Sequence, residues 1–152
     1  AQDGSWLLPM GLQEGSTTQP ASPGGHSAFI AAAATVAKAL NEDAPIPAPV
    51  IPSSDGQSLI PYNGAPLTIH GELNKLIANI TLFRDGAGMH WRTDGTATGP
   101  QANTGGTSDL ATGGNILGEK LAVTMLRDIK FTYEETVGDY SFLGLDGTPR
   151  QA

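Results

Sequence analysis

The chain of 152 residues contains no cysteine. This absence excludes disulfides, thiolate nucleophiles and cysteine-ligated metals, but it leaves the compartment open because secreted proteins can also lack cysteine. Any chemistry must therefore come from histidine, carboxylate, arginine, lysine or hydroxyl groups. The length predicts one domain over 1–152 with a single core.

Positive charge is scarce, with 8 Lys and Arg against 15 Asp and Glu and a net charge of -7. An acidic chain repels a phosphate backbone, so nucleic acid is excluded as a partner. No segment approaches the run of about 20 apolar residues that a membrane-spanning helix needs. We therefore expect neither nucleic acid nor a membrane as a partner.

Only 15% of the residues are charged, whereas the chain has 20 Gly and 11 Pro. This composition predicts long loops, which we place at 1–23, 41–66 and 95–114. The loop over 41–66 contains six prolines and an Asp-Gly pair, which together predict a short hairpin within one domain. The low charge also indicates that other protein covers part of the surface, so we expect an oligomer.

Three helices are expected within a helical core over 24–130. They run from His26 to Leu40, from Thr68 to Phe83 and from Asn115 to Lys130. Their apolar faces follow the helical period and comprise Phe29, Ile30, Ala33, Ala37 and Leu40, then Ile69, Leu73, Leu76, Ile77 and Ile80, then Ile116, Leu117, Val123, Leu126 and Ile129. The tail over 139–152 turns at Asp146-Gly147 and predicts a small hairpin. The fold class is therefore mainly α.

Two glycines, Gly24 and Gly25, directly precede the first helix. They allow backbone amides to approach an oxyanion, and the helix N-terminus adds partial positive charge. His26 follows in the first turn, where the helix dipole favours a neutral imidazole that can act as a base. An ordinary glycine-rich cap and a surface histidine explain the same residues when each is taken alone.

A second group of polar residues follows the second helix. Arg84 continues the apolar stripe of that helix, and a buried arginine needs an anion, for which Asp85 or a core carboxylate is one alternative. His90 precedes Asp94 by four residues, so this carboxylate could orient the imidazole ring. Packing against Trp91 is the alternative explanation of His90.

The ordered combination of G-G-H with R-x5-H-x3-D is more specific than any of its parts. The segments GGHSAFIAAAATVAKAL, GELNKLIANITLFRDGAGMHWRTDG and ILGEKLAVTML resemble consecutive helices of the vanadium-dependent haloperoxidases, in particular bromoperoxidases. This family shares its site with the type 2 phosphatidic acid phosphatase superfamily. The resemblance implies a helical bundle of the haloperoxidase and acid phosphatase type, of which this chain is the C-terminal, vanadate-binding part.

The resemblance also implies a role for each residue. His90 matches the vanadium ligand, or the phosphorylated nucleophile of the phosphatases, and Arg84 matches the arginine that neutralises equatorial oxygens. His26 matches the acid-base histidine. The amide of Gly25, preceded by Gly24, matches an oxyanion-binding group, and Asp94 aligns with the residue that orients the nucleophile. The implied cofactor is vanadate, or phosphate in the same site. The implied reaction oxidises a halide, with bromide expected, by hydrogen peroxide in a secreted or periplasmic protein.

The chain departs from the family pattern at three points. No Lys or Arg precedes His26, although the family takes both from an earlier motif, so another chain or a missing N-terminal segment is expected to supply them. Gly24 replaces the serine of S-G-H, for which Ser22 and Ser27 are candidate substitutes. Gln19 stands where algal bromoperoxidases often carry histidine, which leaves halide preference open. A phosphatase of the same superfamily and a non-catalytic assembly protein remain alternatives.

Overall fold

A computed structural model describes residues 22–91, 94, 110–111, 113–133 and 139–152. Its elements, in chain order, are α1 (Gly25–Leu40), β1 (Val50–Pro52), β2 (Leu59–Pro61), α2 (Ile69–Gly86), α4 (Gly113–Thr132), β3 (Ser141–Leu143) and β4 (Pro149–Gln151). The predictions of a mainly α chain, of three helices and of both hairpins are confirmed. Most of the loops predicted over 1–23 and 95–114 lies outside the described residues.

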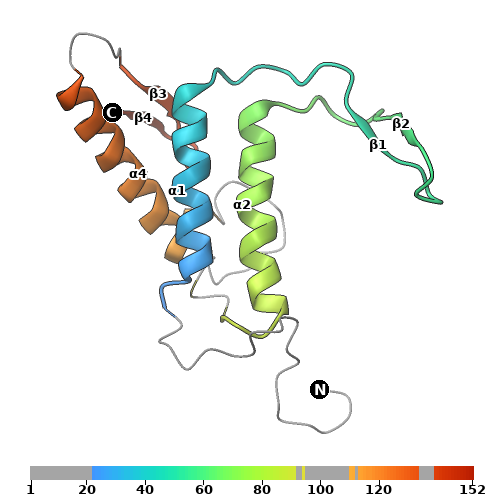
Figure 1. Ribbon diagram of the computed structural model, residues 1–152, viewed down its shortest axis with the longest axis horizontal. Helices are drawn as coiled ribbons and strands as arrows, with labels where there is room; N and C mark the ends of the chain where they lie inside the picture. Colours follow the sequence, from blue (N-terminus) through green and yellow to red (C-terminus); the bar gives the residue numbers. More distant parts are fainter. Residues whose placement is uncertain (1–21, 92–93, 95–109, 112, 134–138) are drawn as a thin grey trace, which may run out of the picture.

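Helix α1 is the central helix, since it lies between α2 and α4 and packs against both (Figure 1). Helix α2 runs antiparallel to α1, whereas α4 starts beside the N-terminus of α1 and diverges from it (Figure 1). The N-termini of α1 and α4 and the C-terminus of α2 therefore meet at one end of the molecule. Within the described residues, none of these helices is both long and apolar enough to cross a bilayer.

Helix α1 buries a different face from the predicted one. Phe29 and Leu40 are 76% and 61% exposed, whereas the alanines Ala28, Ala31 and Ala34 are buried. Of the predicted face, Ile30 packs half-buried against the core. The prediction is wrong at Phe29 and Leu40, because the periodicity of large apolar residues does not identify a contact in which two backbones approach closely. Such a contact selects small side chains and leaves the large ones outside.

The close contact is made by glycines of α4. A Cβ atom on Gly118 would lie 2.2 Å from the carbonyl oxygen of Ala28, and one on Gly114 would lie 2.5 Å from the carbonyl oxygen of Gly24. The buried side of α4 is consequently small or polar and comprises Gly114, Asn115, Gly118, Glu119, Ala122 and Leu126. Of the face predicted for this helix, Leu126 is buried, Ile116 and Val123 are half-buried, and Leu117 and Ile129 are exposed.

Helix α2 begins where its cap was predicted, because the Thr68 side chain accepts a hydrogen bond from the backbone N–H of Gly71 at 3.1 Å. Ile77 is fully buried in the central cluster with Ala31, Ala34, Leu110 and Leu145. The prediction for the apolar face of α2 is confirmed at Ile77. It is wrong at Leu76, which is exposed at the rim.

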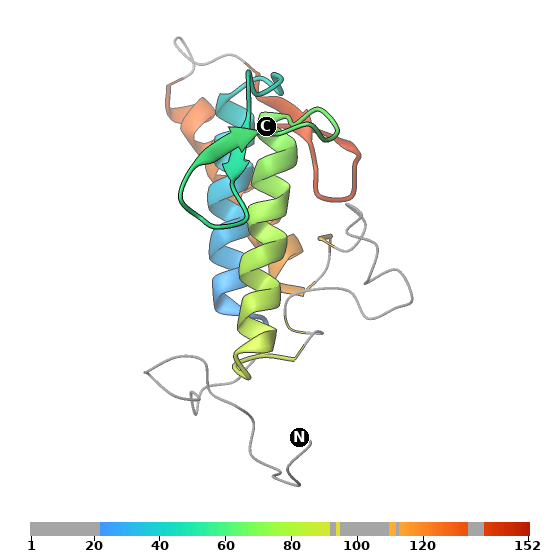
Figure 2. The ribbon, with the colours of Figure 1, turned by 90° about the vertical axis from the view of Figure 1, so that its right-hand side faces the viewer.

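The two hairpins differ in how they meet the helices. Strands β1 and β2 pair antiparallel, all six of their residues are exposed, and the hairpin projects away from the helices (Figures 1 and 2). The β3–β4 hairpin is instead anchored to the helices, because Lys38 Nζ of α1 donates to the Leu143 carbonyl oxygen at 2.5 Å. Burial lowers the pKa of Lys38. This hairpin lies at the end of α1 opposite its N-terminus (Figure 1).

Candidate functional site

The residues singled out by sequence gather at the end of the molecule where α1 and α4 begin and α2 ends (Figure 1). Gly24 is the N-cap of α1, with extended backbone and no side-chain hydrogen bond to satisfy the first amides. Arg84 lies in the last turn of α2 and is only 6% exposed. The burial that helical spacing predicted for this arginine is confirmed.

Asp94 joins two of these segments. Its carbonyl oxygen accepts from the backbone N–H of Gly24 at 2.8 Å, and its Oδ2 accepts from the backbone N–H of Trp91 at 2.9 Å. The same Oδ2 lies 3.5 Å from Nδ1 of His90. Within the described residues Nδ1 is buried and makes no hydrogen bond. A carboxylate that closed this distance would favour a proton on Nδ1 and leave Nε2 with a lone pair for a ligand.

A tight turn after α2 brings His90 back toward Arg84. The backbone N–H of Ala87 donates to the carbonyl of Phe83 at 2.8 Å, and that of Met89 donates to the carbonyl of Arg84 at 3.1 Å. Gly88 has a φ of 74°, a conformation that glycine adopts without steric cost. The five residues between the arginine and the histidine are thus used to end the helix and reverse the chain.

The two glycines before α1 have different surroundings. A Cβ on Gly24 would lie 3.0 Å from Ser27 Oγ and 3.2 Å from the carbonyl oxygen of Asp94, whereas a Cβ on Gly25 would meet no atom within 4 Å. The close approach of the Asp94 backbone therefore favours glycine over a larger residue at position 24. Gly25 is exposed, and a side chain at its position would point into open space.

Ser27 bears on the missing serine of the S-G-H pattern. Its Oγ lies beside the position from which a side chain at residue 24 would start, and the residue is buried in the first turn of α1. A hydroxyl is thus present next to Gly24, although it comes from the residue after the histidine.

His26 differs from the other predicted residues in its lack of contacts. It lies in the first turn of α1 as expected, and its side chain is exposed. Across the described ranges it makes no hydrogen bond or ion pair. Its acid-base role stays a prediction.

The start of α4 belongs to the same end of the molecule, although the sequence pattern did not single it out. Gly114 packs against Gly24, and its neighbour Asn115 is completely buried with its Oδ1 accepting from the Thr81 hydroxyl at 3.1 Å. A signal is present in the sequence, because T-G-G-N at 112–115 repeats the glycine pair of P-G-G-H at 23–26. Its low-complexity surroundings hide this repeat.

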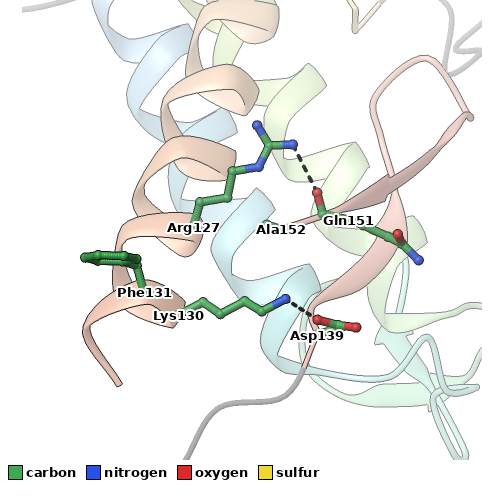
Figure 3. Close-up of a pocket in the computed structure, with 6 residues that line it drawn as sticks. All are labelled: Arg127, Lys130, Phe131, Asp139, Gln151 and Ala152. Carbon is green, nitrogen blue, oxygen red and sulfur yellow. Dashed lines mark hydrogen bonds and ion pairs between the residues drawn. The ribbon is translucent and has the colours of Figure 1, made fainter. Parts of the chain in front are cut away.

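A separate pocket of about 400 Å³ lies at the far end of α4, lined by Arg127, Lys130, Phe131, Asp139, Gln151 and Ala152 (Figure 3). Both of its cations are engaged, since Lys130 pairs with Asp139 and Arg127 donates to the Gln151 carbonyl. In the part of the chain that the structure describes, no three His, Asp or Glu side chains cluster as ligands for a metal cation. The donors near Gly24 suit an anion.

No family model matches the chain. It is 38% identical over 136 residues to a vanadium-dependent bromoperoxidase of Ascophyllum nodosum, a match covering 86% of this chain and 21% of that protein. It is 31% identical over 152 residues to a vanadium-dependent bromoperoxidase of Corallina pilulifera and 30% identical over 152 residues to one of Corallina officinalis. Both cover 98% of this chain and 22% of the relative. The chain thus spans about a fifth of the length of these relatives.

Proposed function

We propose that this chain, a relative of the vanadium-dependent bromoperoxidases over most of its length, is the vanadate-binding part of a vanadium-dependent haloperoxidase. The whole protein would oxidise a halide, bromide above all, with hydrogen peroxide. Its helices would belong to the C-terminal part of a haloperoxidase-type bundle. The observation that carries the proposal is Asp94, which bonds the Gly24 amide while its carboxylate faces His90.

The described residues offer the kinds of group that bind an oxyanion such as vanadate. Arg84 is buried at the end of α2, Gly25 is exposed at the N-terminus of α1, and Asp94 faces Nδ1 of His90, which would leave Nε2 as the nitrogen for a ligand. A guanidinium, a helix N-terminus and an imidazole nitrogen are groups that would hold such an oxyanion. When bound, vanadate would supply Lewis-acid activation of hydrogen peroxide.

Each residue then has a defined task. His90 would hold the anion through Nε2, while Asp94 keeps the proton on Nδ1 and fixes the ring. Arg84 would neutralise oxygen charge from the buried side, and the Gly25 amide would donate from the helix end. His26, exposed at the mouth of the site, would take a proton from incoming hydrogen peroxide through its imidazole.

In the part of the chain that the structure describes, positive charge near the site is limited. The first basic residue of the sequence is Lys38, and its amine is bonded to Leu143 at the far end of α1. Arg84 therefore remains the cation contributed by the described helices near the site. Lysine and arginine from another chain or from a preceding segment would supply the remaining positive charge around the anion, which accords with an oligomer or a longer protein.

The phosphatase alternative gains no support, since the three similar proteins are all bromoperoxidases. Phosphate in place of vanadate and secretion of the protein stay predictions from the family resemblance. A non-catalytic assembly protein would keep this scaffold without using the site. An activity assay therefore distinguishes this alternative from the enzyme.

The test is bromination of an organic indicator by the intact protein, with peroxide and bromide, before and after addition of orthovanadate. We expect activity only with orthovanadate, its complete loss in His90→Ala, and a fall of at least about a hundredfold in His26→Ala. The matched control is His70→Gln, which changes the third histidine at the opposite end of α2, where its Nε2 contacts the Asn41 carbonyl at 2.8 Å. It should retain activity.

Hydrolysis of a phosphate monoester is measured beside bromination. Hydrolysis without vanadate-dependent bromination would replace the proposal by the phosphatase, and the absence of both activities would favour the assembly protein. Equal loss of activity in His90→Ala and His70→Gln would show that the substitutions act through the fold rather than through the site.

A further inference from the structure

Asn115 has a buried donor for which the described residues provide no partner. Its side chain is 0% exposed, its Oδ1 accepts from Thr81 Oγ1 at 3.1 Å, and its Nδ2 has no hydrogen-bond partner within the described ranges. Leaving a buried amide donor unpaired costs about 1–3 kcal/mol. Such a cost is unusual in a fully enclosed position, so the group calls for an explanation.

The position of Asn115 explains why its side-chain amide is kept in a buried place. It lies in the first turn of α4, next to Gly114, whose backbone packs against the carbonyl of Gly24. Thr81, its hydrogen-bond partner, precedes Arg84 by one helical turn on the buried face of α2. The two polar atoms of an amide diverge from one carbon, so Nδ2 points to a different side from Thr81, whose hydroxyl bonds Oδ1, while the residue itself stands in the first turn of α4.

We propose that Asn115 is a further oxyanion-binding residue, and that the first turn of α4 forms part of the same anion site. This inference rests on the proposed function and deepens it, since it identifies a donor from a third helix. Two helices then direct their N-termini at the site, and each brings partial positive charge and unpaired first-turn amides. The amide of Asn115 would add a neutral donor to the guanidinium that Arg84 provides at the end of α2.

A purely structural role for Asn115 gives different expectations. Thr35 provides the comparison, because its Oγ1 is also buried and has no partner in the part of the chain that is described. It lies nine residues after His26 on α1, away from the helix ends. If unpaired buried groups in this protein are only packing defects, replacing either one by an apolar residue should have the same effect on ligand binding, namely none.

The experiment measures the affinity of the intact protein for orthovanadate and for inorganic phosphate by titration calorimetry. In Asn115→Ala we expect both affinities to fall about ten- to a hundredfold, the factor that a hydrogen bond to a charged group provides. In Thr35→Val, the matched control, both affinities should stay within about threefold of the wild type. Parallel loss for the two anions identifies oxyanion chemistry as the common cause.

Asn115→Asp gives a readout that packing alone would not produce. The side chain keeps its shape, but a carboxylate repels an anion whereas a protonated carboxyl can donate to it. The ratio of the variant and wild-type affinities should therefore return toward unity as the pH falls through the carboxyl pKa, which burial raises above the ordinary value of about 3.9. Taking the ratio at each pH cancels the ionisation of the probe itself.

Normal affinity in folded Asn115→Ala and Asn115→Asp, together with loss in Arg84→Ala, would overturn this inference and leave the proposed function standing. Unfolding of both Asn115 variants while Thr35→Val stays folded would also overturn it, since the residue would then be structural. A wild-type protein that binds neither orthovanadate nor phosphate would refute the proposed function and this inference with it.

Discussion

A single methyl group added to α4 should separate the helices that build the site. In Gly118→Ala the new Cβ would lie 2.2 Å from the Ala28 carbonyl oxygen and 2.9 Å from both the Cβ of Ala31 and the backbone nitrogen of Ala32. None of these atoms belongs to a flexible side-chain end that could turn aside. Relief of the overlap therefore requires α1 and α4 to move apart.

The magnitude is the balance of two opposing effects. Overpacking of a well-packed interface costs about 1–3 kcal/mol, and a clash against backbone belongs at the upper end of that range. Alanine gains up to about 1 kcal/mol over glycine in a helix interior. We expect a net loss of about 2 kcal/mol in the free energy of unfolding, or about 4–8 °C in the thermal midpoint.

Thermal unfolding followed by circular dichroism, with urea unfolding beside it, measures this loss. The matched control is Gly86→Ala at the end of α2, where an added Cβ meets no atom within 4 Å, so its stability should be unchanged or slightly raised. Since Gly114 and Gly24 lie along the same contact, Gly118→Ala should also weaken orthovanadate binding. Equal stability of the two variants would refute the close helix contact.

Two further predictions concern the C-terminal hairpin. Glu119 is buried and accepts from the Leu145 backbone N–H at 2.5 Å and from Arg150 Nε at 2.9 Å, so Glu119→Ala should lower the free energy of unfolding by about 3 kcal/mol. Glu119→Gln, which keeps an acceptor for Leu145, should cost clearly less, and equal losses in urea unfolding would contradict this. Arg150 and Thr148 hold the pKa of Asp146 well below its ordinary value of 3.8. The Asp146 carboxylate therefore contributes stability above about pH 3.8 that is lost as the pH falls further. The difference in thermal midpoint between wild type and Asp146→Asn should shrink between pH 7 and pH 3, and a constant difference would argue against the ion pair.

Local signals in the sequence were sufficient for several features. Thr68 predicted the start of α2 because a threonine side chain can satisfy a first-turn amide. The helical period that placed Ile77 in the core also placed Arg84 on the buried side of the same helix. Asp146-Gly147 predicted the β3–β4 turn, and Gly147 has a φ of 75° there. Each of these depends on residues close together in the chain.

The buried faces of α1 and α4 could not be predicted in the same way. Periodicity ranks large apolar residues as core, and Phe29 is nevertheless exposed because Ala28 and Ala31 pack on glycines of α4. Whether a face of small residues is a contact depends on a matching face elsewhere in the chain. That match is a property of pairs of segments, which the pattern of one segment at a time does not contain.

The sequence by itself determined the chemistry that is possible at this site, because without cysteine it had to come from Gly24, Arg84, His90, Asp94 and their neighbours. Only the tertiary structure decided the composition of the site. It bonded Gly24 to Asp94 and packed the first turn of α4, where Asn115 lies, against Gly24. The physical reason is that helix direction and close glycine packing bring together residues that are distant in the chain. The site that we propose therefore draws on α4 as well as on α1 and α2.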